Sequence, residues 1–365
     1  MSAEGYQIGE ADLLALSLGA ALLGTGGGGN PYIGRLRLRE MLRRGGRIRM
    51  LPITALPEDA WIAAVGGIGA PVVGMEKIRQ GEESLRALRA VEEAAGVRVA
   101  ALIAAEIGGA NAMDPMLTAA QAGLPVIDGD GMGRAFPELQ MTSFAIYGQP
   151  PSPGAIADAK GNVVVFRHVL DMIWLERLAR RTAVDMGASA GFCTAPMQAG
   201  FVGATLIPGT VTEALAIGRA LIAARAQHQD VVARLAEATG AHVLFTGKVT
   251  DVRRELRGGF AVGEALIAGV GAHAGAAARI AIQNENLLLW VDGVVVATVP
   301  DLIINLDLET GEPITTETLR YGQRLAVLGR AVHPRMKTAA ALRFVGPAAF
   351  GYPDIAFTPL PGGAW

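Results

Sequence analysis

Three short apolar runs, each followed directly by a glycine-rich loop, constrain the fold of this chain more than any other feature. The runs are Trp61–Val65, Val97–Ala105 and Leu124–Ile127, and stretches with helical spacing, such as Glu82–Ala95, separate them. Strand and helix patterns that alternate in this way are typical of βαβ units, in which helices cover a parallel sheet. We therefore expect an α/β N-terminal domain with a largely parallel sheet.

The C-terminal part of the chain has a different pattern, in which β-like runs follow one another. These runs are Val243–Val252, Gly259–Ile267, Arg279–Val291 and Val294–Val299. Asp292 and Gly293, between the last two runs, are the residues favoured in a two-residue hairpin turn. The expected organisation is an α/β glycine-loop domain over residues 1–170, a helical extension over 171–240 that packs on it, and a mostly β domain over 241–365.

The composition indicates a soluble enzyme-sized protein. Its 365 residues are 51% hydrophobic and 18% charged, which favours a large core over disorder. A net charge of −2 gives no reason to expect binding to nucleic acid or to an anionic membrane. No apolar run reaches the roughly 18 residues that a membrane span requires, and the single cysteine, Cys193, cannot form an intramolecular disulfide. We expect a cytoplasmic homo-oligomer that binds neither nucleic acid nor membrane.

Polar side chains follow two of the predicted strands. Glu106 and Asn111 follow the Val97 run, while Asp128, Asp130 and Arg134 follow the Leu124 run. Ligands of open parallel sheets bind at the carboxyl ends of the strands, so we expect these groups to converge on one site. The alternative is that the glycines after the strands simply form turns.

The densest polar cluster contains Asp128, Asp130, Arg134 and Glu138. Neighbouring carboxyl groups can take different pKa values, so that one serves as an acid and the other as a base. They can equally hold a divalent metal such as zinc together with Glu106 or a histidine, although no pair of histidines has a metal-binding spacing. A surface Asp-Gly turn is the third interpretation, and the metal requirement stays open.

A fourth glycine-rich loop precedes a predicted helix. Its residues are Gly26, Gly27, Gly28, Gly29 and Asn30. Asn30 and Pro31 are the residues preferred at the N-cap and first position of a helix. Because no strand precedes this loop, it does not fit a dinucleotide fingerprint. Its backbone N–H groups could instead hold a carboxylate or a ring oxygen, or the loop could be a flexible connection.

Three further features allow two interpretations each. Cys193 could be a nucleophile or metal ligand, or a small buried hydrophobic residue. The run of arginines from Arg35 to Arg49 could bind nucleic acid, but we favour a solvated helix face or a subunit contact. The amides of Gln283–Asn286 need partners if they are buried, so they could line a domain interface or a site between the domains.

Several motifs together resemble the S-methyl thiohydantoin desulfurase family. They are GTGGGGNPY at Gly24, EIGGAN at Glu106, DGDGMGRAFPELQM at Asp128, QNEN at Gln283 and ETGEPI at Glu309. The resemblance implies an N-terminal α/β domain and a β-rich C-terminal domain. It also implies action on a five-membered thiohydantoin ring that derives from a sulfur-containing histidine derivative.

For this substrate we expect hydrolysis at the ring carbon that bears sulfur. Water attacks this carbon, a tetrahedral intermediate forms, and a thiol leaves to give a hydantoin. The reaction needs an activated water and a proton for the leaving group. We assign water activation to Asp128 or Asp130, directly or through a metal, and proton donation to Glu106 or Glu138.

Other polar groups are expected to orient the substrate. Asn111, Arg134 and the backbone of Gly26–Asn30 would orient the ring and its carboxylate side chain. In a second scheme Cys193 displaces the thiol through a covalent adduct. The competing functions are a hydantoinase-like cyclic amidohydrolase, which opens the ring, and a non-catalytic accessory subunit of a hydantoinase complex.

Overall fold

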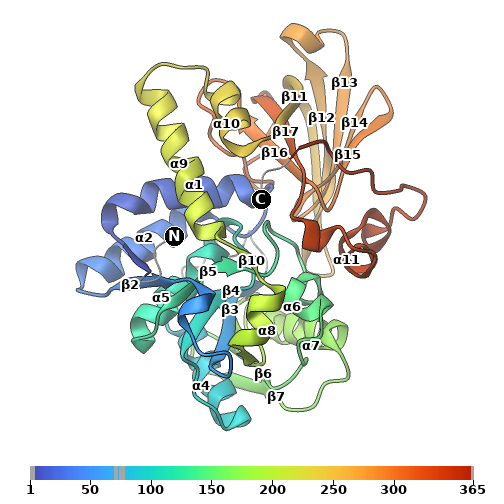
Figure 1. The fold of residues 1–365 in the computed structure, drawn as a ribbon. Helices are drawn as coiled ribbons and strands as arrows, with labels where there is room; N and C mark the ends of the chain where they lie inside the picture. Colours follow the sequence, from blue (N-terminus) through green and yellow to red (C-terminus); the bar gives the residue numbers. More distant parts are fainter. Residues whose placement is uncertain (1–4, 70–72, 74–78, 363–365) are drawn as a thin grey trace.

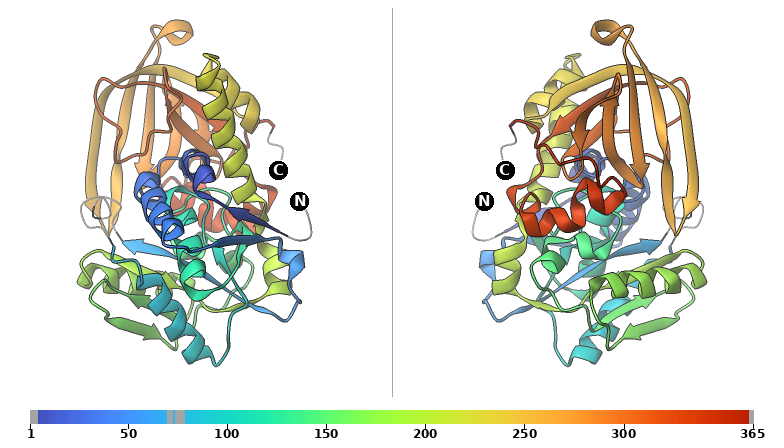
Figure 2. Two further views of the ribbon diagram at one scale, coloured as in Figure 1. Left: turned by 90° about the vertical axis from the view of Figure 1, so that its left-hand side faces the viewer. Right: turned by 90° about the vertical axis from the view of Figure 1, so that its right-hand side faces the viewer.

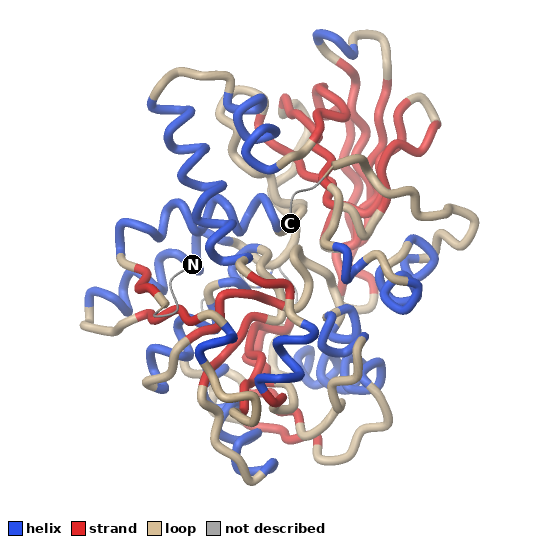
Figure 3. Tube along the Cα trace, viewed as in Figure 1, coloured by secondary structure: helices blue, strands red, loops and turns tan. Residues whose placement is uncertain are grey.

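The strands of the protein form two sheets, which lie at opposite ends of the molecule (Figures 1 and 3). The computed structural model describes residues 5–69, 73 and 79–362. The first sheet carries helices on its faces, and the second is built mainly of antiparallel strands with few helices against it. This arrangement confirms the predicted α/β domain followed by a β-rich domain.

Four parallel strands form the centre of the first sheet, in the order β2 (Ile48–Leu51), β5 (Val126–Asp130), β4 (Ala101–Ala104) and β3 (Trp61–Gly69). Every residue of β4 is buried. A strand that is covered on both faces reads as a continuous apolar run, which explains why the sequence shows β4 without alternation.

Antiparallel strands extend this sheet on both sides. β1 (Tyr6–Ile8) pairs with β2, and beyond β3 the order continues with β8 (Ser189–Cys193), β6 (Gly154–Ala157) and β7 (Val163–Phe166). The short strands β9 (Met197–Gln198) and β10 (Ile207–Pro208) pair with β3 and β5. β8, β9 and β10 therefore belong to the first sheet, although the sequence indicates a helical extension over this part of the chain.

Helices cover both faces of the first sheet. α4 (Glu83–Ala95) and α5 (Asp114–Ala122) pack on one face, where Ala63, Val65 and Leu102 join their core. The opposite face, with Ile62 and Ile103, packs against α6 (Ser143–Ile146) and α8 (Ala199–Thr205). α7 (Met172–Asp185) packs against β3, β6 and β8.

α1 (Leu13–Leu23) is buried except at Leu14 and crosses α9 (Thr210–Ala226) at close range. A Cβ atom added at Gly19 would lie 1.8 Å from the Ala214 carbonyl oxygen, and one at Gly218 would lie 1.8 Å from that of Ala15. Only glycine allows such an approach of two helix backbones. α10 (Val231–Thr239) then leads into the second sheet.

The second sheet is antiparallel and curls around its own apolar core (Figure 2). Its strands are, in spatial order, β15 (Val294–Thr298), β14 (Glu285–Val291), β13 (Ala277–Gln283), β12 (Phe260–Gly269), β11 (His242–Arg257), β17 (Arg324–Arg330) and β16 (Leu302–Asp307). The turn between β14 and β15 lies at Asp292 and Gly293, as predicted. α11 (Ala339–Val345) follows the last strand.

None of the helices in the described part of the chain has the length and apolar character needed to cross a bilayer.

Candidate active site

A pocket of about 180 Å³ lies at the carboxyl ends of β3 and β4. Gly66 and Gly67 of β3, Glu106 after β4, and Phe136 in the segment that follows β5 all line it. The structure therefore brings the three glycine-rich loops to one place, where the crevice of a parallel sheet is expected. Asn284 and Glu285 of the second domain also line this central pocket.

Glu106 is the sequence-predicted acid that the structure places in the central pocket with its side chain almost fully buried. Its Oε1 accepts a hydrogen bond from Asn111 Nδ2 at 2.5 Å, and its Oε2 accepts one from the Phe136 backbone N–H at 3.1 Å. Burial outweighs these bonds and raises the pKa of Glu106 to about 7. A carboxyl group with this pKa can take up and release a proton at neutral pH.

Asn111 positions Glu106 and also lines the pocket. Its Oδ1 accepts a hydrogen bond from the Gly67 backbone N–H at 3.2 Å, while its Nδ2 donates to Glu106. Because both ends of the Asn111 amide are hydrogen-bonded, Asn111 ties the Glu106 carboxyl to the C-terminal part of β3.

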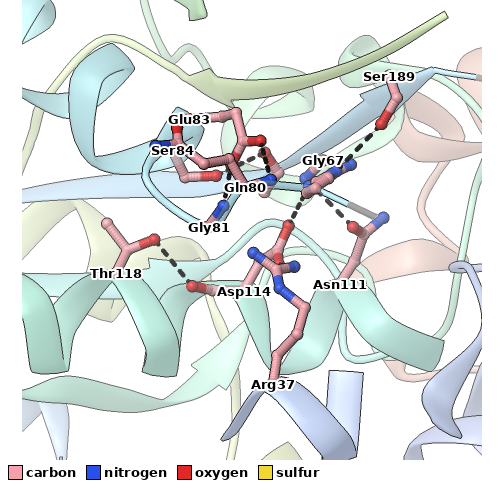
Figure 4. Close-up of polar contacts among 12 residues, drawn as sticks. Arg37, Gly67, Gln80, Gly81, Glu83, Ser84, Asn111, Asp114, Thr118 and Ser189 are labelled. Carbon is pink, nitrogen blue, oxygen red and sulfur yellow. Dashed lines mark hydrogen bonds and ion pairs between the residues drawn. The ribbon is translucent and has the colours of Figure 1, made fainter. Parts of the chain in front are cut away.

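A pair of arginines, Arg37 and Arg79, forms a cationic end of the pocket. Arg37 projects from α2 (Pro31–Arg43), and both guanidinium groups donate to Asp114, at 2.8 and 2.6 Å (Figure 4). Burial alone would raise the pKa of Asp114, but Arg79 and Arg37 outweigh it and lower that pKa. Two cations share one anion here, so this arginine pair retains one net positive charge beside the pocket.

Glu138 lies at another part of the pocket wall, near Glu176 and Arg180 of α7. Burial and the negative charge of Glu176 raise the pKa of Glu138. Glu176 is paired with Arg180, whose Nη2 also donates to the Pro137 carbonyl oxygen at 2.8 Å. Of the two predicted proton donors, Glu106 is the more deeply buried.

The second domain reaches the pocket through the hairpin between β13 and β14. Asn284 at its tip has a positive φ of 57°, a conformation that asparagine tolerates better than most residues. Asn284 N–H donates to the Ala261 carbonyl oxygen, and its Oδ1 accepts from the Ala261 N–H. This turn sends the following residue, Glu285, into the pocket, where it is buried.

The glycine loop, Gly24–Asn30, forms the seam between the two domains. The carbonyl oxygens of Thr25 and Gly26 accept hydrogen bonds from the Asn286 and Thr316 N–H groups of the second domain, both at 2.9 Å. Those of Gly28 and Gly29 accept from the Asn111 and Ala110 N–H groups of the first. In these contacts the loop offers carbonyl oxygens, whereas the sequence suggested an anion site made of N–H groups.

The members of this loop differ in their relation to the pocket. Gly28, Gly29 and Asn30 line it, while Gly26 and Gly27 lie against Thr316 and Glu285. Asn30 caps α2 as predicted, since its Oδ1 accepts from the Tyr32 N–H at 2.9 Å.

Asp128 and Asp130 lie in β5 and do not line the pocket. Asp130 Oδ2 accepts from the N–H groups of Ile107, Met132 and Gly133, at 2.8–3.0 Å. Its burial nevertheless raises its pKa to about 7. Through these contacts Asp130 supports the loops after β4 and β5. They do not favour the predicted role of Asp130 in activating water.

Asp128 contacts the N-terminus of α9. Its carboxylate accepts from the backbone N–H groups of Val211 and Thr212 at the start of α9, and from the hydroxyl group of Tyr6 at 3.1 Å. Carboxylates stabilise the N-terminus of a helix in this way. The structure therefore gives Asp128 a structural contact where the sequence suggested a catalytic one.

Arg134 is fully buried behind the pocket and joins the two domains. Its Nη1 donates to the carbonyl oxygens of Pro300 and Asp301, and its Nη2 donates to Thr25 Oγ1 at 2.8 Å. It does not line the pocket, so these contacts replace the predicted one with substrate.

Cys193 points away from the pocket. Phe192, the preceding residue of β8, and Thr194, which follows the strand, line the pocket, and successive side chains of an extended chain point to opposite faces. Cys193 is fully buried, and this burial raises the pKa of its thiol. A thiol in this position is a core residue, and the geometry does not support the covalent scheme.

Within the described part of the chain, no group of three or more His, Cys, Asp or Glu side chains is arranged to hold a metal ion.

Arg37, Arg79 and Glu285 line the pocket but were not among the predicted site residues. Arg37 was assigned with its neighbours to a solvated face or a subunit contact, and Glu285 lay within a motif considered only for its amides. The QNEN motif was the available signal for Glu285, because polar residues inside a β-like run need buried partners.

Two family models together match nearly the whole chain. The S-Me-THD-like N-terminal domain matches residues 11–168, and the S-Me-THD-like C-terminal domain matches residues 170–360. The chain belongs to the S-Me-THD-like family. This finding confirms the resemblance to the S-methyl thiohydantoin desulfurases that the motifs indicate. None of the curated proteins compared with the chain matches it.

A solved structure shares the fold of this family member. A protein from Chromobacterium violaceum, whose crystal structure is known, is 23% identical in sequence and superposes with a TM-score of 0.81. The match covers 97% of this chain and 99% of that protein. The two chains therefore have the same two-domain architecture.

Proposed function

We propose that the protein hydrolyses the carbon–sulfur bond of an S-methyl thiohydantoin that carries a carboxylate side chain, releasing methanethiol and leaving a hydantoin. Family membership supports the ring class. The observation that carries the proposal is Glu106, a buried carboxyl group whose pKa lies near 7 and whose side chain lines a pocket suited to a small molecule.

The ring carbon between the two nitrogens is electrophilic because it bears sulfur and a C=N bond. Glu106 removes a proton from the water that attacks it. Asn111 holds the Glu106 carboxyl in place for this transfer. A positioned general base of this kind typically contributes about 10²–10⁴-fold in rate.

The arginine pair supports the choice of an anionic substrate. Arg37 and Arg79 carry one net positive charge after their shared contact with Asp114, and both line the pocket. Guanidinium groups bind carboxylates through paired hydrogen bonds. We place the substrate's carboxylate at this end of the pocket and its ring at Glu106.

The test is to incubate the purified protein with the S-methyl thiohydantoin in oxygen-18-labelled water. We expect methanethiol, detected with a thiol-trapping dye, and a hydantoin that contains the label. Glu106→Gln should abolish this turnover, whereas Glu92→Gln should retain it, because Glu92 is also buried and accepts a backbone N–H but lies outside the pocket. An acyclic S-methylisothiourea acid that keeps its sulfur, formed without thiol, would refute the proposal and indicate a cyclic amidohydrolase.

A further inference from the structure

Glu285 is a buried carboxyl group that the mechanism above does not use. Its side chain is 2% exposed, it lines the central pocket, and its Oε2 has no hydrogen-bond partner among the described residues. A buried polar atom without a partner destabilises the folded protein. β13, β14 and the glycine loop hold the Glu285 carboxyl at the pocket without this partner, which suggests that a bound molecule supplies the missing contact.

The glycine loop makes room for this carboxyl group. A Cβ atom at Gly27 would lie 2.0 Å from Glu285 Oε1, so any other residue at this position would occupy the space of the carboxyl. The loop is fixed on both sides of Gly27, because Gly26 and Gly28 accept backbone hydrogen bonds from the second and the first domain. The domain interface therefore holds Glu285 at the pocket.

Glu106 and Glu285 face the same pocket from different domains. Burial, followed by the negative charge of Glu106, raises the pKa of Glu285 well above its usual value. The other charged groups that act on Glu285 are Arg134, which lowers this pKa, and Glu317, which raises it. For Glu106, the charge of Asp130 raises the pKa and the charge of Arg134 lowers it.

We propose that Glu106 and Glu285 form a carboxyl pair across the domain interface, in which Glu285 is a second catalytic residue that donates a proton to the substrate ring. This inference rests on the proposed function and adds the general acid to it. Two carboxyl groups in environments that separate their ionisation can divide the roles of base and acid.

The pair balances the protons of the whole reaction. In the first step ionised Glu106 takes a proton from water as the oxygen bonds to the ring carbon, and Glu285 gives its proton to the ring nitrogen of the C=N bond. In the second step the carbon–sulfur bond breaks. Protonated Glu106 then gives its proton to the departing methanethiolate, while ionised Glu285 takes the hydroxyl proton as the new C=O bond forms. Both groups return to their starting states.

The pH dependence of kcat/KM separates a catalytic from a structural role of Glu285. The wild type should show a bell-shaped profile, because the base must be ionised and the acid protonated. Glu285→Gln should lose the alkaline limb, keep the acidic limb near pH 7, and turn over about 10²–10⁴-fold more slowly. A variant that keeps both limbs would overturn the proposal. Glu92→Gln serves as the matched buried control and should keep both.

A measurement without turnover distinguishes this proposal from the proposed function. The infrared difference spectrum between wild type and Glu285→Gln should show a protonated-carboxyl band that persists above pH 7, because the other buried acids are present in both proteins. In Glu106→Gln the remaining band should titrate at lower pH, because the neighbouring negative charge is gone. These results would support the pair even if no thiol were released. A Glu285 band that titrates identically with and without Glu106 would overturn it, whatever the enzyme's activity.

Discussion

Replacing Glu106 by Gln should make the stability of the protein less dependent on pH. The pKa of Glu106 is about 7 in the folded protein, against 4.5 for an unperturbed glutamate. Between these values the folded state holds a proton that the unfolded chain releases, so the free energy of unfolding falls as the pH rises. At 1.36 kcal/mol per pH unit, the loss for this fully buried group is about 3 kcal/mol.

The assay is urea-induced unfolding of wild type and Glu106→Gln between pH 4.5 and about pH 8. The glutamine places an NH₂ group against a donor, either Asn111 Nδ2 or the Phe136 N–H, which lowers stability equally at every pH. The stability of the wild type relative to the variant should therefore fall by about 3 kcal/mol over this range. Asp130, which also has a raised pKa, is present in both proteins, so only its interaction with Glu106 contributes to the difference.

Glu92→Gln is the control for this measurement. Arg89 and the Val99 N–H hold the pKa of Glu92 below its usual value although burial opposes them, so its contribution is already complete above pH 4.5. The difference between this variant and the wild type should stay flat over the same range. A flat difference for Glu106→Gln as well would show that Glu106 ionises normally and would refute the reasoning.

Three further substitutions test other parts of the site. Arg37→Gln should raise KM about tenfold or more with little change in kcat, since a hydrogen bond to a charged group contributes about 1.5–3 kcal/mol. The control is Arg44→Gln, an exposed arginine at the C-terminal end of α2, which should leave both constants unchanged in steady-state assays. Gly27→Ala should displace the Glu285 carboxyl and lower kcat while thermal unfolding still shows a folded protein, and normal turnover would contradict the tight contact. Cys193→Ala should retain turnover, and full loss of thiol release in a folded variant would restore the covalent scheme.

The sequence predicts β3, β4 and β5 because a strand buried on both faces leaves an uninterrupted apolar run. The fourth parallel strand, β2, was not predicted, since it is short and Arg49 interrupts its apolar residues. The sequence predicts Glu106 and Asn111 at the site for a related reason, since both directly follow such a run. The antiparallel neighbours β6 and β8 were harder to assign to this sheet. Their place depends on pairing between segments far apart in the chain, and local pattern carries no information about it.

The assignment of Asp128 and Asp130 depends on where β5 ends. The apolar pattern places the end at Ile127, but the strand continues to Asp130. Both carboxylates therefore point from within the sheet toward backbone N–H groups, and the pocket begins only beyond them at Met132. Composition alone cannot distinguish a carboxylate that supports a loop from one that meets a substrate.

Arg37 and Glu285 lie at the pocket although the sequence did not predict them there. Arg37 has the same spacing as its arginine neighbours along α2, and only the packing of α2 on α5 turns it toward Asp114. Glu285 reaches the pocket because two domains meet at the glycine loop. Such contacts between distant segments are set by the tertiary structure.

The most direct test of the account is the rate of methanethiol release as a function of pH, measured for the wild type and Glu106→Gln. Since Glu106 must be ionised to activate water, the wild-type rate should rise through a midpoint near pH 7. The variant should lose this rise together with most of the rate. Thiol release by Glu106→Gln at the wild-type rate and with the same pH midpoint would contradict the central claim that Glu106 is the catalytic base.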